Sequence, residues 1–394
     1  MSFNKVVSSE RIHIGFFGLR NAGKSSVVNA VTNQELSVVS DVKGTTTDPV
    51  KKAMELLPLG PVVIIDTPGF DDIGDLGELR VKKTREILSL TDIAVLVVDA
   101  TIGISKIDNE LIALFKEKNT PYIIAFNKSD LIKNRNSLNN EIYVSAKTNE
   151  GINNLKEALG KLAKQKDNLK PIVCDLLNKG DTVILVIPID EAAPKGRIIL
   201  PQQLVLRELL DYNFTDICFK ETELFKTINS LKQKPSLVIC DSQVFKEVDE
   251  ILEEDILLTS FSILFARYKG DLKTLVNGAN TLTSLKDGAN ILISEGCTHH
   301  RQCNDIGTVK IPNLVQKFTN KSFNFSFTSG GEFPEDLEKY DLIIHCGGCM
   351  LNEKEMKSRL EKANKQNIPI VNYGVILALM NGILERALKV FNNL

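Results

Sequence analysis

The stretch GLRNAGKS, residues 18–25, decides the fold of the first part of this chain, because it matches the pattern G-x-x-x-x-G-K-S. It follows an apolar run at residues 12–17 and precedes a helical pattern that begins near Lys24. Glycines let backbone N–H groups turn toward phosphates, and the N-terminus of the following helix favours negative charge. We therefore expect a phosphate-binding loop in which Lys24 reaches the β- and γ-phosphates and the Ser25 hydroxyl binds Mg²⁺.

Two further motifs follow apolar runs. The motif DTPG begins at Asp66, whose carboxylate can hold the magnesium shell. The motif NKSD begins at Asn127 and resembles the guanine-specific N-K-x-D motif of GTPases. The resemblance implies that Asp130 accepts hydrogen bonds from the guanine ring N–H and amine, that Asn127 steadies the base edge, and that the Lys128 stem covers the ring.

The tripeptide SAK, residues 145–147, resembles the last guanine loop of GTPases, in which the backbone N–H of Ala146 faces the base oxygen. Four motifs in this order, each at the end of an apolar run, favour GTP over ATP. The cofactor-binding residues that we expect are Asn21, Ala22, Gly23, Lys24, Ser25, Ser26, Thr46, Asp66, Gly69, Asn127, Lys128, Asp130, Ser145, Ala146 and Lys147.

The segment KGTTTD, residues 43–48, resembles the switch segment G-T-T-R-D of the GTPase branch that includes TrmE and Era. Thr46 aligns with the threonine that reaches magnesium and the γ-phosphate, whereas Thr47 departs from the arginine of that pattern. Phe70 stands where Ras-like proteins place a water-orienting glutamine, so we expect slow intrinsic hydrolysis. The expected catalytic residues are Lys24, Thr46 and Asp66.

Asn21 in the phosphate-binding loop resembles a potassium ligand of the same branch. This resemblance predicts hydrolysis that potassium stimulates. On residue type alone, Asn21 is equally well explained as a turn residue.

Alternating strand and helix patterns continue along the chain and predict an α/β protein of three α/β domains, the first a doubly wound P-loop GTPase sheet. The expected domains are a GTPase domain at residues 1–167, a dimerisation domain at 172–264 and an iron–sulfur domain at 265–394. We expect strands at 12–17, 62–66, 93–99, 122–126, 182–189, 236–240, 256–260, 289–294, 341–345 and 368–372. We expect helices at 79–90, 109–118, 202–212, 221–231, 244–252, 272–285, 352–366 and 376–391.

The composition limits the class of protein. The chain has 394 residues, of which 43% are hydrophobic and 25% charged, and its formal net charge is -2. This balance is typical of a globular protein and gives no electrostatic reason to expect nucleic-acid binding. No apolar run is long enough for a membrane span, and no cleavable signal is evident, so we expect a cytoplasmic protein.

Seven cysteines, an odd number, argue against a framework of disulfides. Cys174, Cys218 and Cys240 stand apart in apolar surroundings, and we interpret them as core thiols.

The other four cysteines, with three of the four histidines, are concentrated near the C-terminus and predict a metal site. Cys297 and His299 follow one apolar strand pattern, and the motif HCGGC, which begins at His345, follows another. Because the carboxyl ends of parallel strands meet at one edge of a sheet, we expect Cys297 to approach Cys346 and Cys349. The spacing alone leaves a structural zinc site and an iron–sulfur cluster equally open.

The combination of C-x-H, H-C-x-x-C and a TrmE-like GTPase segment is similar to the HydF family, the maturation GTPases of FeFe-hydrogenase. The stretch IPIDEAAPKGRIILPQ, residues 187–202, also resembles that family. The resemblance implies a 4Fe-4S cluster on Cys297, Cys346 and Cys349, with an exchangeable fourth position that His299, His345, another residue or solvent fills.

The same resemblance implies a homodimeric scaffold or carrier for the di-iron subcluster precursor. It would receive the precursor from the radical-SAM maturases HydE and HydG and deliver it to the apo-hydrogenase HydA. Two alternatives are an RNA-modification or ribosome-assembly GTPase with a structural zinc domain and, less favoured, an electron-transfer protein.

Overall fold

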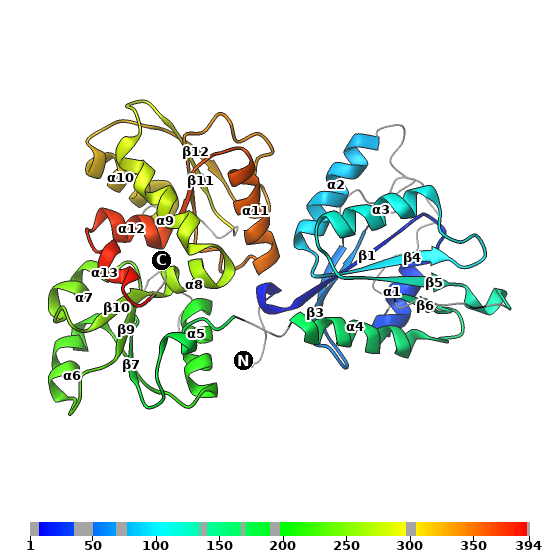
Figure 1. Cartoon of the computed structure of the whole chain (residues 1–394), viewed down its shortest axis with the longest axis horizontal. Coiled ribbons are helices and arrows are strands. Elements are labelled where there is room, and N and C mark those ends of the chain that lie inside the picture. The colour runs from blue at the N-terminus through cyan, green and yellow to red at the C-terminus, as the bar shows by residue number, and fades with distance from the viewer. Residues whose placement is uncertain are drawn as a thin grey trace. The chain divides into compact units, whose positions relative to one another are not determined.

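The computed structural model describes residues 8–34, 50–67, 77–133, 135, 140–166, 170–189, 198–296 and 305–391. The chain divides into two compact units, Met1–Leu169 and Lys170–Leu394 (Figure 1). Within the described residues, one six-stranded sheet lies in the first unit and two four-stranded sheets lie in the second. The predicted α/β fold class is therefore confirmed.

The sheet of the first unit has the strand order β2-β3-β1-β4-β5-β6. Strand β2 is antiparallel to β3, and the other neighbours are parallel. Its strands are β1 (Ile12–Gly18), β2 (Val50–Leu56), β3 (Gly60–Asp66), β4 (Ile93–Asp99), β5 (Tyr122–Asn127) and β6 (Glu141–Tyr143).

Helices cover both faces of this sheet, which explains why its central strands are continuous apolar runs. Successive side chains point to opposite faces of a strand. Phe16 therefore joins the core under α1 (Lys24–Thr32) and α4 (Ile152–Lys166). Phe17 joins the core under α2 (Gly77–Leu90) and α3 (Lys106–Glu117).

The second unit contains two parallel sheets, with the orders β10-β9-β7-β8 and β12-β11-β13-β14. The strands of the first are β7 (Thr182–Val186), β8 (Thr215–Phe219), β9 (Leu237–Cys240) and β10 (Leu257–Ser260). The strands of the second are β11 (Asn290–Ser294), β12 (Asn324–Thr328), β13 (Leu342–His345) and β14 (Ile370–Asn372). The helices of this unit are α5 (Leu200–Asp211), α6 (Leu224–Ser230), α7 (Phe245–Ile251), α8 (Phe261–Lys269), α9 (Leu272–Asn280), α10 (Ile311–Thr319), α11 (Glu353–Lys365), α12 (Tyr373–Met380) and α13 (Leu384–Leu388).

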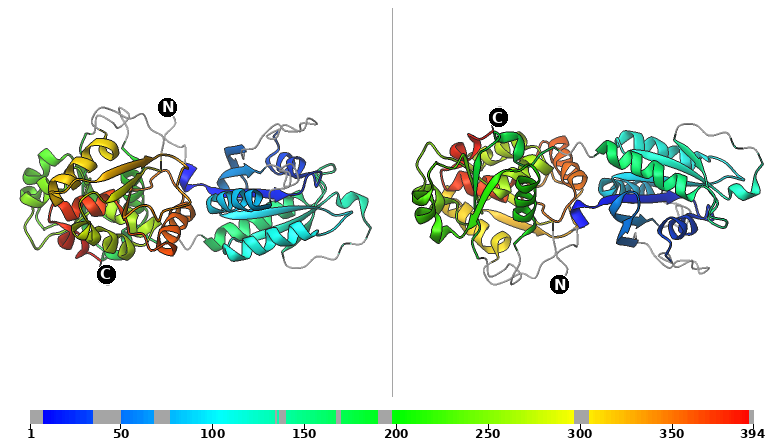
Figure 2. Two further views of the ribbon diagram at one scale, coloured as in Figure 1. Left: turned by 90° about the horizontal axis from the view of Figure 1, so that it is seen from above. Right: turned by 90° about the horizontal axis from the view of Figure 1, so that it is seen from below.

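The two sheets of the second unit share one continuous hydrophobic core. Polar contacts also join them: Arg386 Nη1 donates to Asp249 Oδ1 at 2.7 Å, and Asn372 Nδ2 donates to the Ser262 carbonyl at 3.0 Å. Both views in Figure 2 show the yellow, orange and red segments of the chain gathered in this one unit. The predicted division between residues 264 and 265 stays a prediction.

The predicted final helix at residues 376–391 is wrong, because two short helices, α12 and α13, occupy this segment. The Ile383 N–H donates to the Ala378 carbonyl, and the Gly382 N–H donates to the Leu379 carbonyl, both at 2.9 Å. This pair of bonds, with φ of 73° at Gly382, is a Schellman motif that ends α12.

Three other expectations need correction. The expected helix at 272–285 ends at Asn280 and continues as a short 3₁₀ segment. The expected strand at 182–189 ends at Val186. Cys218 is exposed on β8, whereas Cys174 and Cys240 are buried as predicted.

Candidate functional site

The nucleotide-binding motifs lie at the carboxyl edge of the first sheet. Strand β1 ends at Gly18, where the phosphate-binding loop begins, and Asp66 at the end of β3 is paired in register with Phe16. On the other side of β1, Asp99 at the end of β4 is paired in register with Asn127 at the end of β5. Parallel strands thus bring motifs that are far apart in the sequence to one edge, which is where ligands bind in open α/β sheets.

Lys24, Ser25 and Asp66 contact one another at this edge. Lys24 is buried, with 8% of its surface exposed, and its ammonium forms an ion pair with the Asp66 carboxylate. The Ser25 hydroxyl donates to Asp66 Oδ2 at 3.4 Å. The cation expected to meet the phosphates and the two oxygen groups expected to meet magnesium are therefore adjacent.

Asn127 joins three of the motifs. Its side chain is 3% exposed. Its Nδ2 donates to the carbonyl of Ala22 in the phosphate-binding loop at 3.0 Å, and its Oδ1 accepts from the Ala146 N–H at 3.1 Å. The Ala146 N–H that we expected to face the base oxygen thus has a protein acceptor here, and its contact with guanine stays a prediction.

Asp99 is a site residue that the motif search missed. Lys128 Nζ donates to Asp99 Oδ2 at 2.5 Å, and Thr101 donates to Oδ1 through its N–H at 2.9 Å and its hydroxyl at 2.6 Å. Burial alone would raise the pKa of Asp99, but the hydrogen bonds from Lys128 and Thr101 lower it below its usual value. Asp99 thus holds the lysine expected to cover the guanine ring. An acidic residue that ends an otherwise apolar strand was the available signal.

The remaining expected residues of this site differ in exposure. Ser145 is fully buried, and its hydroxyl accepts from the Thr148 N–H at 3.2 Å. Asn21, which has a left-handed φ of 62°, is exposed, as are Ser26, Asp130 and Lys147. Thr46, Gly69 and the neighbouring Phe70 lie outside the described residues.

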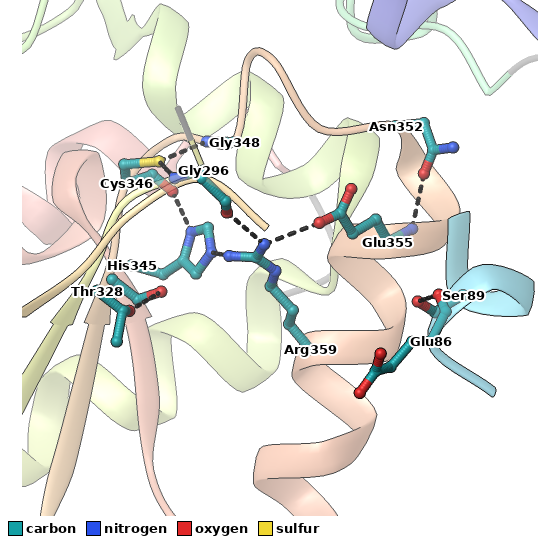
Figure 3. Close-up of polar contacts among 12 residues, drawn as sticks. Glu86, Ser89, Gly296, Thr328, His345, Cys346, Gly348, Asn352, Glu355 and Arg359 are labelled. Atoms are coloured by element: carbon teal, nitrogen blue, oxygen red, sulfur yellow. Dashed lines mark hydrogen bonds and ion pairs between the residues drawn. The ribbon is translucent and has the colours of Figure 1, made fainter. Parts of the chain in front are cut away.

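The second candidate site lies at the carboxyl edge of the sheet formed by β12, β11, β13 and β14. Strand β13 ends at His345 and leads into the loop that holds Cys346 and Cys349. The Gly296 N–H, beyond the end of β11, donates to Cys346 Sγ at 3.0 Å, and the Gly348 N–H donates to the same sulfur at 3.4 Å (Figure 3). The φ of 62° at Gly348 lets the C-x-x-C loop turn back on this sulfur.

The next residue after Gly296 is Cys297, which lies with His299 outside the described residues. Across residues 8–296 and 305–391, apart from the shorter undescribed segments, no group of three or more His, Cys, Asp and Glu side chains is arranged to hold a metal ion. The approach of Cys297 to the other two cysteines stays a prediction.

His345 is fully buried, and protein groups engage both of its ring nitrogens. Arg359 Nη1 contacts Nε2 at 3.0 Å, and Nδ1 lies 2.7 Å from the Cys346 carbonyl (Figure 3). A guanidinium can only donate, so Nε2 accepts and Nδ1 carries the proton. Burial and the charge of Arg359 lower the pKa of His345 to about 3, so the ring is neutral. A role as metal ligand, which would require Nε2 to leave Arg359, stays a prediction.

Burial also affects the protonation state of the Cys346 and Cys349 thiols. It raises the pKa of Cys346 to about 11, against the two N–H donors at its sulfur. It raises the pKa of Cys349 as well, while the charge of Lys269 acts in the opposite direction. Both thiols are therefore protonated at neutral pH, and a metal that binds them must displace protons.

Further buried polar residues around this edge were missed by the sequence analysis. Glu295 is 3% exposed and accepts from the Tyr373 hydroxyl at 3.3 Å. Arg359 is 4% exposed and donates to Glu355 at 2.8 Å and to the Gly330 carbonyl at 2.9 Å. Glu295 and Tyr373 come from different elements, so no short motif contains this pair, and the i,i+4 spacing of Glu355 and Arg359 on α11 does not reveal their contacts with His345 and Gly330.

Comparison with known proteins identifies the family. A model described as a 50S ribosome-binding GTPase matches residues 13–128. The hydrogen maturase F dimerization domain matches residues 172–270, and the hydrogen maturase F tetramerization domain matches residues 273–390. The chain belongs to the hydrogen maturase F family. The first unit of this hydrogen maturase F chain is therefore a P-loop GTPase domain, and it binds GTP.

Individual relatives resemble only part of the chain. The tRNA modification GTPase MnmE of Desulforamulus reducens is 40% identical over 119 residues, which are 30% of this chain and 25% of that protein. The GTPase Der of Mycoplasmopsis pulmonis is 35% identical over 137 residues, which are 34% of this chain and 31% of that protein. The chain thus spans a quarter to a third of the length of these relatives. Among the helices that the structure describes, none is both long and apolar enough to cross a membrane.

Proposed function

We propose that this chain is a GTP-hydrolysing iron–sulfur scaffold of hydrogenase maturation, which assembles the precursor of the di-iron subcluster and delivers it to apo FeFe-hydrogenase. The observation that carries the proposal is the contact between the Gly296 N–H and Cys346 Sγ at 3.0 Å. It joins the chain immediately before Cys297 to the first thiol of the C-x-x-C loop. Membership of the hydrogen maturase F family supports the same conclusion.

The donor set suits an iron–sulfur centre. Two backbone N–H groups already point at Cys346 Sγ, and such donors stabilise a metal-bound thiolate. In the proposal Cys297, Cys346 and Cys349 hold a 4Fe-4S cluster, and His299 or His345 are candidates for the fourth position. A cluster with three thiolate ligands supplies one iron whose remaining coordination position can accept cargo.

The GTPase residues have separate proposed roles. Lys24 stabilises negative charge on the β- and γ-phosphates, and Ser25, Thr46 and Asp66 hold magnesium or its water shell. Because Lys24 is paired with Asp66 in the present structure, binding of the nucleotide with magnesium exchanges that pair for phosphate and metal contacts. Asn21 is proposed as a potassium ligand, and GTP hydrolysis then changes affinity for partner proteins.

Potassium dependence is tested by measuring GTP hydrolysis in matched potassium and sodium buffers. Faster turnover in potassium, lost in an Asn21→Ala variant, supports the proposed ligand. Equal rates in the two buffers contradict it.

A homodimer is proposed to form at strand β8, which lies at an edge of its sheet among the described residues. The Ile187 N–H donates to the Phe219 carbonyl, so Phe219 faces β7 and the preceding residue, Cys218, directs its backbone groups away from β7. Such an edge is a template for pairing with a second chain. The dimerization domain matched at residues 172–270 contains β8.

The proposed partners are the maturases HydE and HydG, which supply the precursor, and the apo-hydrogenase HydA, which receives it. The proposal places the protein in the cytoplasm and includes no nucleic-acid or membrane partner. The similarity to MnmE supports one alternative function, an RNA-modification GTPase with a structural zinc site.

Metal analysis after anaerobic purification separates the two functions. About four iron and four sulfide per chain support the scaffold. Zinc without sulfide supports the alternative and contradicts the scaffold. A Cys346→Ser variant is expected to lose the iron and to fail in activating apo-hydrogenase, whereas Cys218→Ser, which changes an exposed cysteine, is expected to keep both. Full activation by the Cys346→Ser variant contradicts the proposal.

A further inference from the structure

A buried lysine contacts the loop that carries the C-x-x-C motif. Lys269, the last residue of α8, is 2% exposed. Its Nζ donates to the Leu351 carbonyl at 3.0 Å and to the Cys349 carbonyl at 3.2 Å, and it lies 5.7 Å from the centre of the Phe265 ring. The ammonium is thus hydrogen-bonded to the main chain at Cys349 and at Leu351, on the C-terminal side of the motif.

We infer that Lys269 is a positioning residue for the metal centre, which fixes the loop at Cys349 and compensates the negative charge of the thiolate-bound cluster. The inference rests on the proposed function, because the charge that Lys269 meets is that of the cluster. It adds a residue outside the cysteine motifs to the site.

The first part of the inference concerns geometry. The two carbonyls that accept from Lys269 belong to Cys349 itself and to the residue two positions later. Rotation of the Cys349 backbone would break both bonds inside a site where water cannot replace them. The backbone that carries the Cys349 thiol is therefore held in place before any metal binds.

The second part concerns charge. A buried ammonium is unfavourable unless negative charge or strong acceptors surround it. Three thiolates give an oxidised 4Fe-4S centre a net negative charge, and a nearby cation stabilises this charge, more so after reduction. The ammonium of Lys269 donates to the carbonyl of Cys349 itself at 3.2 Å. The buried guanidinium of Arg359 instead donates to Glu355 at 2.8 Å and contacts His345 at 3.0 Å. Lys269 is thus the better placed of the two to act on Cys349.

The position of Lys269 in the chain links two parts of the family pattern. Lys269 belongs to the segment matched by the dimerization domain, residues 172–270, whereas Cys349 and Leu351 belong to the segment at 273–390. The loop that carries the C-x-x-C motif therefore depends on a side chain from the neighbouring segment. A fragment that begins at residue 273 would lack it.

The test compares Lys269→Met and Lys269→Gln with Lys357→Gln in the full-length protein. Methionine removes both the charge and the hydrogen bonds, and glutamine removes the charge but keeps a donor. Lys357 is a matched control, because it is a half-exposed lysine on α11 whose partner is Glu353 at 2.5 Å. Circular dichroism and thermal melting verify that each variant folds.

The readouts are the rate at which a chelator extracts iron and the midpoint potential from an EPR-monitored redox titration. Lys269→Met is expected to lose iron about 10- to 100-fold faster than wild type, as for other residues that support metal ligands. Both Lys269 variants are expected to shift the midpoint to more negative potentials, since reduction adds negative charge. Lys269→Gln is expected to retain iron longer than Lys269→Met, and Lys357→Gln is expected to match wild type.

The outcomes separate this inference from the proposed function. Wild-type protein that holds the cluster, with variants of unchanged extraction rate and potential, overturns the inference alone. Wild-type protein that takes up no iron–sulfur cluster overturns the proposed function and the inference with it. If Lys269→Met does not fold, Lys269→Gln decides, and an unchanged potential in that variant overturns the inference.

Discussion

Replacement of Asn127 by alanine tests whether the three guanine-nucleotide loops act as a unit. The substitution removes the bonds to the Ala22 carbonyl and the Ala146 N–H, at 3.0 Å and 3.1 Å, from a side chain that is 3% exposed. Each lost hydrogen bond costs about 0.5–1.5 kcal/mol, and a buried partner left without a bond costs about 1–3 kcal/mol. We therefore expect Asn127→Ala to destabilise the arrangement of the three loops by about 2–4 kcal/mol in total.

The cost should appear mainly in nucleotide affinity, because GTP requires the phosphate-binding loop and the base loops to be positioned together. Since each 1.4 kcal/mol is about a tenfold change, the expected loss of affinity is about 30- to 700-fold. The assay is equilibrium titration and dissociation of a fluorescent guanine nucleotide, with a melting curve to verify the fold. The control is Asn109→Ala, which removes an exposed side chain that donates to the Ser105 carbonyl at 3.0 Å.

The refuting result is a folded Asn127→Ala variant whose affinity lies within about threefold of wild type, well below the loss expected from two buried hydrogen bonds. The loops would then hold their positions without this side chain. A loss of similar size in Asn109→Ala would instead show that the assay reports general destabilisation.

Three further predictions concern other parts of the chain. If the proposed dimer forms along β8, Cys218→Pro should shift it to monomer in light scattering, because proline removes a backbone N–H that points outward from β8, and the melting temperature should change little. Lowering the pH from 7 to 5 should cost about 2 kcal/mol in the free energy of urea unfolding through His345, whose pKa is lowered to about 3. The sign follows because the unfolded chain takes up a proton below about pH 6.5 that the folded chain does not. Gly278→Ala should destabilise by about 1–3 kcal/mol, because its Cβ would lie 2.0 Å from the Ile370 carbonyl oxygen, whereas Gly331→Ala, with open space around it, should leave the melting temperature unchanged.

Each of these has its own contrary outcome. A stable dimer of the proline variant would exclude pairing through β8. A His345→Gln variant with the same dependence on pH as wild type would assign that dependence to other groups. Equal melting temperatures for the two alanine variants would mean that the contact between α9 and β14 relaxes without cost.

The buried parallel strands were predictable from the sequence, including the edge strands β10 and β14, but the exposed edge strands β8 and β12 were not. Strands such as β4 (IAVLVVD) are buried on both faces, so that their composition alone identifies them. Strands β8 (TDICF) and β12 (NFSFT) lie at sheet edges and contain no buried residue, which makes their sequences resemble loops. The end of α12 depends on backbone hydrogen bonds at Gly382 that apolar periodicity does not reveal.

The candidate sites follow a similar division. Short motifs identified Lys24, Asp66 and Asn127 as neighbours, because strand ends converge at one edge of a parallel sheet. They could not identify Asp99 or Lys269, which lie 29 and 80 positions from the groups that they contact. Contacts of this kind depend on how helices and strands pack together. A motif of adjacent residues does not show which distant residues will be in contact.

The shared core of the second unit limits how the protein can move. A dimer paired along β8 would set one spacing between its two C-x-x-C loops, because the described residues of β8 and of these loops belong to one compact unit with one continuous core. In such a dimer, we expect GTP hydrolysis in the first unit to leave that spacing unaltered. Equal distances between spin labels placed beside the two loops, with GTP or with GDP, would be the corresponding measurement.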